Sequence, residues 1–286
     1  MKTGLVLEGG AMRGLFTAGV LDVLMEQGIR LDGAVGVSAG AAFGCNYKSG
    51  QIGRAVRYNV CFARDWRFCS VRSLLLTGDL FGAKFCYETV PMELDKFDYD
   101  AYRRDPMPFY AVCTDMETGK AVYTNVPDCS GAQMDWIRAS ASLPLVSRPV
   151  VIGGRAYLDG GIADAIPLAF MEKQGYARNL VILTQPEGYR KKPAHPLIRT
   201  ALRKHPQLAE TMMQRHEMYN RETAYVFAQA AAKKAFVICP PQPIGISRTE
   251  RDPEKLRAVY ALGRRTATEQ LDALRAFLQE GADASL

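Results

Sequence analysis

A serine flanked by small residues stands early in the chain, in the run Gly36-Val37-Ser38-Ala39-Gly40. The G-x-S-x-G pattern is typical of a sharp turn from a strand into a helix, and it leaves the serine hydroxyl exposed on strained backbone. Because Gly36 and Gly40 have no side chain, neighbouring backbone can approach the turn closely. A serine presented in this way predicts a nucleophile for acyl transfer, of which the simplest case is ester hydrolysis.

A glycine-rich turn, Gly9-Gly10-Ala11-Met12-Arg13-Gly14, comes shortly before the serine. Because it opens a helix, its N–H groups and the helix dipole can stabilise negative charge. We expect the N–H groups of Gly10 and Ala11 to face the oxyanion of a tetrahedral intermediate. No Lys-Ser/Thr pair follows the glycines, which excludes a P-loop, and Ala11 weakens a dinucleotide fingerprint. Arg13 is expected either to bind a substrate phosphate or to hold the loop through a salt bridge.

The serine needs a proton acceptor, and most serine hydrolases use a histidine oriented by a carboxylate. The chain has three histidines, His195, His205 and His216, all far downstream in a proline-rich loop or a long helix. In α/β-hydrolases several strands precede the nucleophile, whereas only one strand–helix unit and one more strand precede Ser38 here. The sequence therefore argues against the usual triad fold, with a histidine base kept as the alternative.

An aspartate offers a second proton acceptor. Asp159 stands in Leu158-Asp159-Gly160-Gly161-Ile162, at the end of an apolar strand. We expect Gly160 and Gly161 to let the backbone pack closely against a neighbouring loop. A carboxyl group is a weak base in water, but burial raises its pKa, and a hydrogen bond to Ser38 favours proton transfer. An ordinary Asp-Gly-Gly turn is the simpler interpretation; the setting favours a Ser38–Asp159 dyad.

The elements that must position these residues alternate between strands and helices, as in a parallel sheet covered on both faces. The first two motifs are carried by a strand at Thr3–Leu7, a helix at Gly14–Gln27, a strand at Leu31–Val37 and a helix from Ala39. Downstream the patterns predict the hairpins Phe109–Thr114/Lys120–Thr124 and Pro149–Ile152/Arg155–Leu158, a helix at Asp135–Ser142, strands at Leu180–Thr184 and Phe236–Cys239, and helices over 206–234 and after the N-cap Asp252. One apolar face of the last helix extends from Leu256 to Leu278.

Residues 67–107 are apolar and aromatic but are interrupted by glycines and prolines. Two interpretations stay open for this segment. It forms ordinary core and cover, or it lines or closes a pocket for an acyl chain. The residues concerned are Trp66, Phe68, Leu74–Leu76, Phe81, Phe85 and Tyr87.

Composition limits the class of protein. A chain of 286 residues with 48% hydrophobic and 23% charged residues can bury a large core. Its net charge of +6 fits a solvated surface, or attraction to anionic lipid or phosphorylated substrates, and no basic, aromatic block indicates nucleic acid as a partner. Seven scattered cysteines without a CxxC pair indicate reduced thiols and no metal site. We predict neither signal peptide nor membrane span, hence a cytoplasmic protein with at most peripheral membrane contact.

Taken together, the three motifs resemble the patatin-like phospholipases. That family has a glycine-rich oxyanion loop ending in Arg/Lys-Gly, then G-x-S-x-G, and a distant Asp-Gly-Gly/Ala. The resemblance implies Ser38 as nucleophile, Asp159 as proton acceptor and the loop from Gly9 to Gly14 as oxyanion hole. The run Arg138-Ala139-Ser140-Ala141-Ser142-Leu143-Pro144 is similar to the family's segment upstream of the aspartate, and Pro167 follows at the usual spacing.

One position departs from the family, which usually has a third glycine where this chain has Ala11. We expect alanine to require negative φ more strictly, so the loop geometry is least certain there. The resemblance covers about residues 3–185 and implies a three-layer α/β/α fold with a mostly parallel sheet. We expect a catalytic domain at 1–185 and a mainly helical region at 186–286 that completes or covers the core.

The implied function is a serine lipid acyl hydrolase that cleaves a lipid or other fatty-acyl ester through an acyl-enzyme. No metal or organic cofactor is implied. Two alternatives use the same residues differently: acyl transfer to an alcohol or thiol acceptor, and a silent site in a lipid-binding or regulatory protein.

Overall fold

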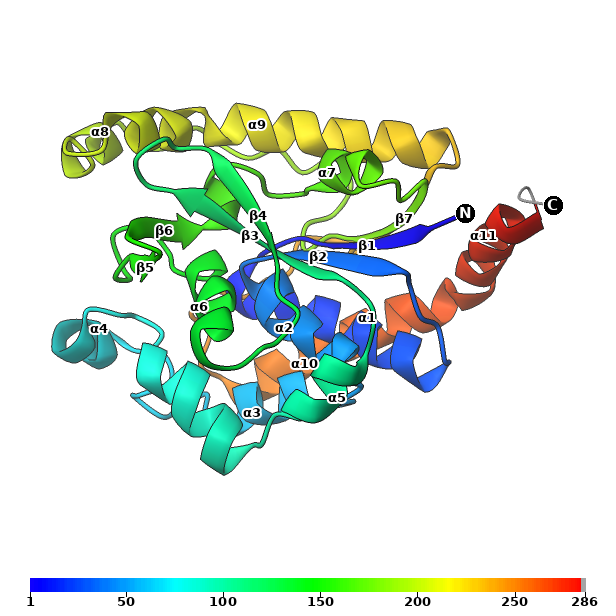
Figure 1. The fold of residues 1–286 in the computed structure, drawn as a ribbon, viewed down its shortest axis with the longest axis horizontal. Helices are drawn as coiled ribbons and strands as arrows, with labels where there is room; N and C mark the ends of the chain where they lie inside the picture. Colours follow the sequence, from blue (N-terminus) through cyan, green and yellow to red (C-terminus); the bar gives the residue numbers. More distant parts are fainter. Residues whose placement is uncertain (284–286) are drawn as a thin grey trace.

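A computed structural model describes residues 1–283 and shows one mixed sheet between two layers of helices (Figure 1). Over that range the sheet has eight strands, in the order β5-β6-β3-β2-β1-β7-β8, with β4 paired to β3. Their bounds are β1 (Thr3–Leu7), β2 (Gly33–Val37), β3 (Phe109–Asp115), β4 (Ala121–Asn125), β5 (Val150–Ile152), β6 (Arg155–Asp159), β7 (Arg178–Ile182) and β8 (Ala235–Ile238).

The centre of the sheet is parallel and one side of it is antiparallel. β1 pairs in parallel with β2 and β7, as do β2 with β3 and β7 with β8. The two predicted hairpins form the antiparallel part, because β4 and β6 pair with β3 and β5 pairs with β6. The predicted α/β class with a mostly parallel centre is therefore confirmed.

Both faces of the sheet are covered. Leu5 and Leu7 on β1 belong to the core below the sheet in Figure 1, and Val6 belongs to the core above it, because successive side chains of a strand point to opposite faces. The lower layer contains α1 (Leu15–Glu26), α2 (Ala39–Lys48), α3 (Arg54–Cys61), α5 (Tyr99–Arg104), α6 (Gly131–Ser140) and α10 (Pro253–Glu269). The upper layer contains α7 (Leu168–Lys173) and the long α9 (Pro206–Ala231).

The chain after residue 185 builds on the same sheet as the chain before it. It supplies the edge strand β8, the helix α9, and α10, which crosses α1 where both helices have glycine. A Cβ atom on Gly19 would lie 2.2 Å from the Tyr260 carbonyl oxygen, and one on Gly263 would lie 2.0 Å from that of Phe16. The division into 1–185 and 186–286 stays a prediction, and both parts share one sheet.

The prediction of a single last helix is wrong in one respect, because the structure has two helices there. α10 ends at Glu269, and α11 (Leu271–Asp283) follows after Gln270. The turn brings the apolar side of α11 to the sheet edge, where Phe277 packs on Phe236 of β8 with ring centroids 5.7 Å apart. The predicted N-cap is confirmed, since the Asp252 side chain accepts a hydrogen bond from the Glu254 N–H.

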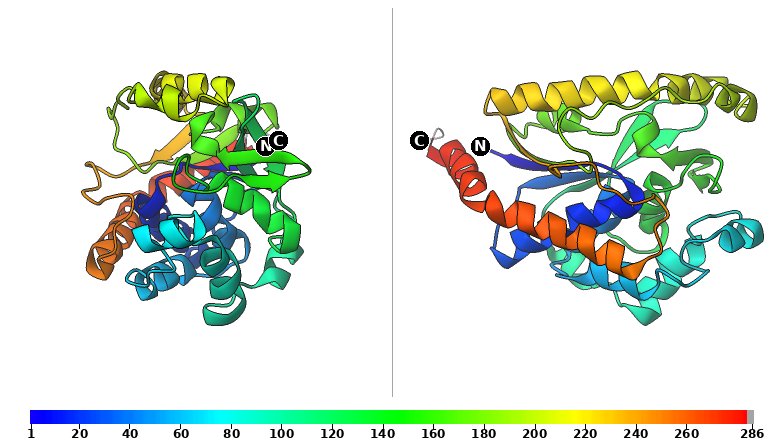
Figure 2. Two further views of the ribbon diagram at one scale, coloured as in Figure 1. Left: turned by 90° about the vertical axis from the view of Figure 1, so that its left-hand side faces the viewer. Right: turned by 180° about the vertical axis from the view of Figure 1, so that it is seen from behind.

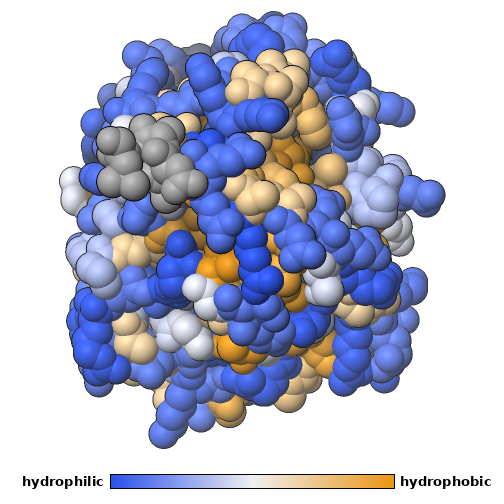
Figure 3. Space-filling view, turned by 90° about the vertical axis from the view of Figure 1, so that its right-hand side faces the viewer, coloured by the Kyte–Doolittle hydropathy of each residue, from blue (hydrophilic) through white to orange (hydrophobic). Residues whose placement is uncertain are grey.

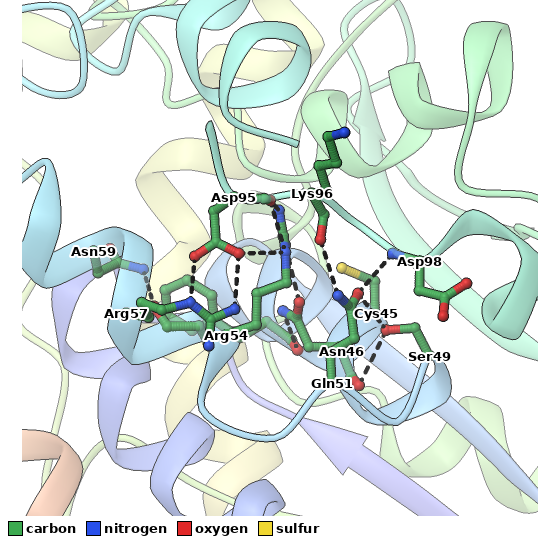
Figure 4. A network of polar contacts seen from close by, with 12 residues as sticks. Cys45, Asn46, Ser49, Gln51, Arg54, Arg57, Asn59, Asp95, Lys96 and Asp98 are labelled. Carbon is green, nitrogen blue, oxygen red and sulfur yellow. Dashed lines mark hydrogen bonds and ion pairs between the residues drawn. The ribbon is translucent and has the colours of Figure 1, made fainter. Parts of the chain in front are cut away.

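The segment 67–107 folds into short helices below the sheet, α4 (Val71–Thr77), the π-type helix η2 (Phe85–Leu94) and α5. A polar network fastens it to α2 and α3 (Figure 4). Arg54, buried on α3, donates to the Asp95 carbonyl oxygen and to Asn46 Oδ1 (3.0 Å), and Arg57 forms a two-bond ion pair with Asp95. The remaining short helices are η1 (Ala11–Gly14), η3 (Gly160–Ile162) and α8 (Leu197–Ala201).

The two ends of the sheet differ. Figure 2 (left) faces the end at which β1 and β2 finish, where the predicted motifs lie. The opposite end, near both termini, is mainly hydrophilic with apolar side chains between the polar ones (Figure 3). Among the described residues, no helix combines the length and apolar character that crossing a membrane would require.

Candidate active site

The strand register brings Ser38 and Asp159 together. β2 ends at Val37, which pairs with Val112 of β3. The next residue of β3, Cys113, pairs with Asp159 of β6, while β4 occupies the other edge of β3 at both positions. β6 therefore continues along the edge of β3 where β2 stops, and its last residue meets the residue that follows β2.

Ser38 adopts the strained backbone that the G-x-S-x-G pattern predicts. It lies between β2 and α2 with φ 56° and ψ −121°, a region that L residues rarely occupy. A Cβ atom on Gly36 would lie 2.6 Å from backbone atoms of Ala41, and one on Gly40 would lie 2.4 Å from the Leu7 carbonyl oxygen. Both glycines are therefore required by close packing of the turn against α2 and β1.

Ser140 holds the turn from the other side, a contact that the sequence did not predict. Its hydroxyl oxygen accepts a hydrogen bond of 2.9 Å from the Ser38 N–H, and both residues are buried. Two residues later, the Ser142 carbonyl oxygen accepts a 2.8 Å bond from the Asp159 N–H. The segment 138–144, singled out only by its resemblance, thus links the backbones of Ser38 and Asp159.

The Asp159 carboxyl group is buried beside Ser38. Burial raises its pKa above the ordinary value, and a hydrogen bond with the Ser38 side chain, the charge of Arg215 and the Gly161 N–H oppose that rise. The Gly161 N–H donates to Asp159 Oδ1 over 2.8 Å, and the Thr114 hydroxyl donates to the Asp159 carbonyl oxygen over 2.8 Å. A carboxylate in these surroundings is a stronger base than one in water.

The two glycines after Asp159 pack closely, but one expectation about them is wrong. A Cβ atom on Gly160 would lie 2.1 Å from the Val112 carbonyl oxygen, so the neighbour is strand β3 and not a loop. At Gly161 the nearest atoms to a Cβ would be Asp159 Oδ1 at 3.1 Å and an Arg215 nitrogen at 3.4 Å. The difference arises because β6 pairs directly with β3.

The predicted oxyanion loop lies against the serine. A Cβ atom on Gly9 would lie 2.7 Å from the Ser38 Cβ atom. The N–H groups of Gly10 and Ala11 have no acceptor among the described residues, while the Arg13 N–H donates to the Gly10 carbonyl oxygen within η1. Ala11 has a φ of 49°, so the expected restriction to negative φ is wrong. The loop adopts this conformation at a cost of about 1–3 kcal/mol.

A buried acid supports the loop from behind, and the sequence did not predict it. Glu8 accepts hydrogen bonds from the Thr184 N–H (2.6 Å) and the Tyr219 hydroxyl (2.8 Å). Burial raises its pKa, and these two bonds oppose the rise. The Thr184 hydroxyl also donates to the Gly9 carbonyl oxygen over 3.0 Å. The chain just after β7 and helix α9 therefore fix the start of the loop.

Two cavities of different character meet at Ser38. The first encloses about 890 Å³, part of it open to solvent, and its lining is mainly apolar and aromatic. The second encloses about 450 Å³ and is lined mainly by polar and charged groups, Asp159 among them. Ala11, Ser38 and Leu143 line both. A bound ester can therefore place one side in an apolar space and the other in a polar one.

Each of the two interpretations of the segment 67–107, core or pocket wall, holds for part of it. Phe68, Phe81 and Tyr87 line the apolar cavity, and Phe85 is buried in the core. On α4, by contrast, Leu75 and Leu76 are 80% and 63% exposed. Part of the segment is thus pocket wall, part is core, and part projects into solvent.

The three histidines lie away from the serine. His195 is exposed, and His216 on α9 has Nδ1 3.0 Å from the Met213 carbonyl oxygen. No histidine is present among the described residues that line either cavity. The position of the histidines supports a carboxylate as the proton acceptor.

Comparison with known proteins agrees with this arrangement. A family model described as "Patatin-like phospholipase" matches residues 5–171, more than half of the chain. The chain therefore belongs to the patatin-like phospholipase family, which confirms the resemblance of its motifs. A second model, described as a domain of unknown function (DUF6363), matches residues 205–279.

Individual relatives range from one that matches nearly all of this chain to others that match about three fifths of it. The chain is 31% identical over 278 residues to "Uncharacterized protein YjjU" of Escherichia coli, covering 92% of this chain and 75% of that protein. It is 30% identical over 181 residues to "Lysophospholipase NTE1" of Mycosarcoma maydis, covering 61% of this chain but 9% of that protein. Among solved structures, VipD from Legionella pneumophila superposes with a TM-score of 0.49 and 14% identity, covering 95% of this chain and 67% of VipD.

Proposed function

We propose that the protein is a serine lipid acyl hydrolase that cleaves a carboxylic ester through a Ser38–Asp159 dyad. The observation that carries this proposal is the place of Ser38 at the junction of an apolar and a polar cavity, beside Asp159 and two N–H groups that have no acceptor within residues 1–283. Membership of the patatin-like phospholipase family and similarity to a protein named lysophospholipase support lipid esters as the substrate class.

In the first half of the reaction, the Ser38 oxygen attacks the ester carbonyl carbon while its proton passes to Asp159. The N–H groups of Gly10 and Ala11 stabilise the oxyanion. As the carbon–oxygen bond to the alcohol breaks, Asp159 returns the proton to the departing oxygen. The acyl chain stays bonded to Ser38 and lies in the apolar cavity.

In the second half, water attacks the acyl-enzyme from the polar cavity. Asp159 accepts a proton from the water and then gives it to the Ser38 oxygen as the fatty acid leaves. The raised pKa of Asp159 suits both directions of transfer, since a base is most effective when its pKa approaches the working pH.

The test compares wild type with Ser38→Ala and Asp159→Asn, using a fluorophosphonate probe and p-nitrophenyl esters of short and long chains. We expect Ser38→Ala to abolish labelling and each variant to lower kcat/KM by about 10³-fold or more. His216→Ala is the matched control and should keep wild-type activity. Thermal unfolding checks that the variants fold.

Three outcomes would contradict the proposal. Labelling that survives Ser38→Ala would place the nucleophile elsewhere, and full activity of Asp159→Asn would remove the dyad. Absence of labelling and turnover in folded wild type would favour a lipid-binding protein. Adding an alcohol acceptor to the assay separates hydrolysis from acyl transfer, because transfer diverts the acyl group from free fatty acid to a new ester.

A further inference from the structure

The polar cavity at Ser38 is lined by four basic side chains. Arg13 comes from the oxyanion loop, Lys191 from the loop after β7, Arg215 from α9, and Arg248 from the chain between β8 and α10. Three of the four thus come from the chain after residue 185. Arg248 is exposed and the other three are partly buried, so the positive charges extend from the surface toward the serine.

These four basic groups form no ion pair among the described residues, although the charges of Glu8 and Asp159 act on Lys191 and Arg215 over a longer distance. None of them forms an ion pair with a carboxylate whose side chain the structure describes. Arg13 Nε is buried without a hydrogen-bond partner among the described residues, which is costly unless a ligand oxygen accepts its hydrogen bond. The salt bridge considered for Arg13 from the sequence is therefore absent among the described residues, and its other predicted role, binding phosphate, remains.

The carboxyl groups in this cavity already have partners. Glu8 accepts from the Thr184 N–H and the Tyr219 hydroxyl, and Asp159 interacts with Ser38. Burial and the neighbouring charge of Arg215 lower the pKa of Lys191 to about 7. Four basic groups line the cavity against the two carboxyl groups of Glu8 and Asp159, so it has an excess of positive charge that a bound anion would relieve.

Hydrogen bonds hold the backbone of Lys191 and Arg248 and the guanidinium of Arg215 at the cavity. The Lys191 N–H donates to Asn220 Oδ1 (2.8 Å), Asn220 donates back to the Lys191 carbonyl oxygen (3.2 Å), and both bonds tie the loop to α9. Arg215 Nε donates to the Gly161 carbonyl oxygen, next to the Asp159 carboxyl group. Arg248 is placed beside the loop by a backbone bond from the Met12 N–H.

We propose that this cavity binds a phosphate on the alcohol side of the ester and selects lipids whose headgroup is net anionic. The proposal rests on the proposed function and adds a specificity to it. Arginine and lysine are the usual partners of phosphate oxygens, and the cavity shares Ser38 with the apolar cavity. A phosphate close to the ester would lie among the cations while the acyl chain occupies the apolar side.

The same cavity disfavours a zwitterionic headgroup such as phosphocholine. A quaternary ammonium needs an aromatic face or a carboxylate. The face of Tyr219 is already covered by the Lys191 ammonium, 4.1 Å from the ring centroid, and Glu8 and Asp159 are engaged. A choline group would have to extend past Arg248, where like charges repel it.

The experiment measures kcat/KM for three oleoyl esters that differ in headgroup: lysophosphatidate, lysophosphatidylcholine and monooleoylglycerol, all in the same neutral detergent micelles. We expect wild type to prefer lysophosphatidate over each of the others by about tenfold or more, a preference that weakens at high salt. Lys191→Gln and Arg248→Gln should each lower the ratio of kcat/KM for lysophosphatidate to kcat/KM for monooleoylglycerol about five- to tenfold. Arg221→Gln, an exposed position on α9, is the matched control and should keep the wild-type ratio.

The results separate failure of the headgroup selectivity from failure of the proposed function. Equal kcat/KM for the three lipids, with Ser38-dependent hydrolysis intact, would overturn the selectivity and leave the proposed function standing. Loss of all Ser38-dependent turnover would instead overturn the proposed function. Glycerol 3-phosphate should inhibit monooleoylglycerol hydrolysis competitively. Equal inhibition by inorganic phosphate without a preference for lysophosphatidate would mark a site for free phosphate and refute headgroup recognition.

Discussion

Replacing Gly40 by alanine tests how tightly the serine turn is packed against β1. A Cβ atom at this position would lie 2.4 Å from the Leu7 carbonyl oxygen and 2.9 Å from that of Glu8. Ordinary contact begins at 3.4 Å, so the start of α2 must move about 1 Å away from the end of β1. Both contact atoms are backbone oxygens at or just after the end of β1, and neither can rotate out of the way as a side chain could.

The expected magnitude has two parts. Overpacking a well-packed site costs about 1–3 kcal/mol, and alanine recovers about 0.5–1 kcal/mol of helix propensity. We therefore expect a loss of up to about 2.5 kcal/mol in the free energy of unfolding. The effect on activity should be larger, because a misplacement of 1 Å between Ser38 and the oxyanion loop costs about 10²-fold in rate.

The assay combines denaturant unfolding with kcat/KM on a p-nitrophenyl ester. Gly44→Ala is the matched control, one turn further along α2. Its Cβ atom would meet side-chain atoms, Leu7 Cδ1 at 2.5 Å and Phe109 Cε2 at 2.9 Å, which can adjust. We expect Gly44→Ala to lose stability but to keep most of its activity. If Gly40→Ala were as active as wild type, or if both variants lost activity equally, the reasoning would be refuted.

Two further predictions concern a buried acid and the support of the serine. Burial, and then the charge of Asp164, raise the pKa of Glu222 to about 9. In the unfolded chain this group ionises near pH 4.5, so it lowers stability progressively as pH rises from there toward 9. Glu222→Gln should therefore raise the free energy of unfolding by more than about 1 kcal/mol at pH 8 and by less at pH 5; a gain independent of pH would contradict this. Ser140→Ala leaves the buried Ser38 N–H unpaired, and kcat should fall about tenfold with little change in KM; an unchanged kcat would show that the bond does not position the turn.

Local sequence patterns predicted much of the frame. The buried run at residues 3–7, the two hairpins and the N-cap Asp252 were all identifiable from neighbouring residues, because strands, turns and caps depend on side chains close in sequence. The break at Gln270 was not predicted, since the apolar period continues through it. After that break Phe277 packs on Phe236, which lies on a strand more than thirty residues before Gln270.

The residues of the site also divide into those that local sequence predicted and those that it did not. Ser38, Asp159 and the loop from Gly9 to Gly14 lie in short local motifs, which are recognisable because the tight turns require glycine or other small residues. Glu8 and Tyr219 carry no such motif, because a lone acid or tyrosine occurs at many positions in any chain, and Ser140 lies in a run singled out only by its resemblance to the family. Their roles depend on contacts that span 102 residues in the bond from Ser38 to Ser140 and 211 in the bond from Tyr219 to Glu8.

The sequence by itself therefore determined the class of chemistry: a serine on a strained turn, a glycine-rich loop before it and an aspartate after a strand. The tertiary structure decided what surrounds that chemistry. The pairing of the strands places β6 on β3 just past the end of β2. The packing of α9 brings Lys191 and Arg215 into the same cavity as Asp159. Charge and shape in a pocket come from side chains distant in sequence, and only the packing of the sheet and its helices brings them to one place.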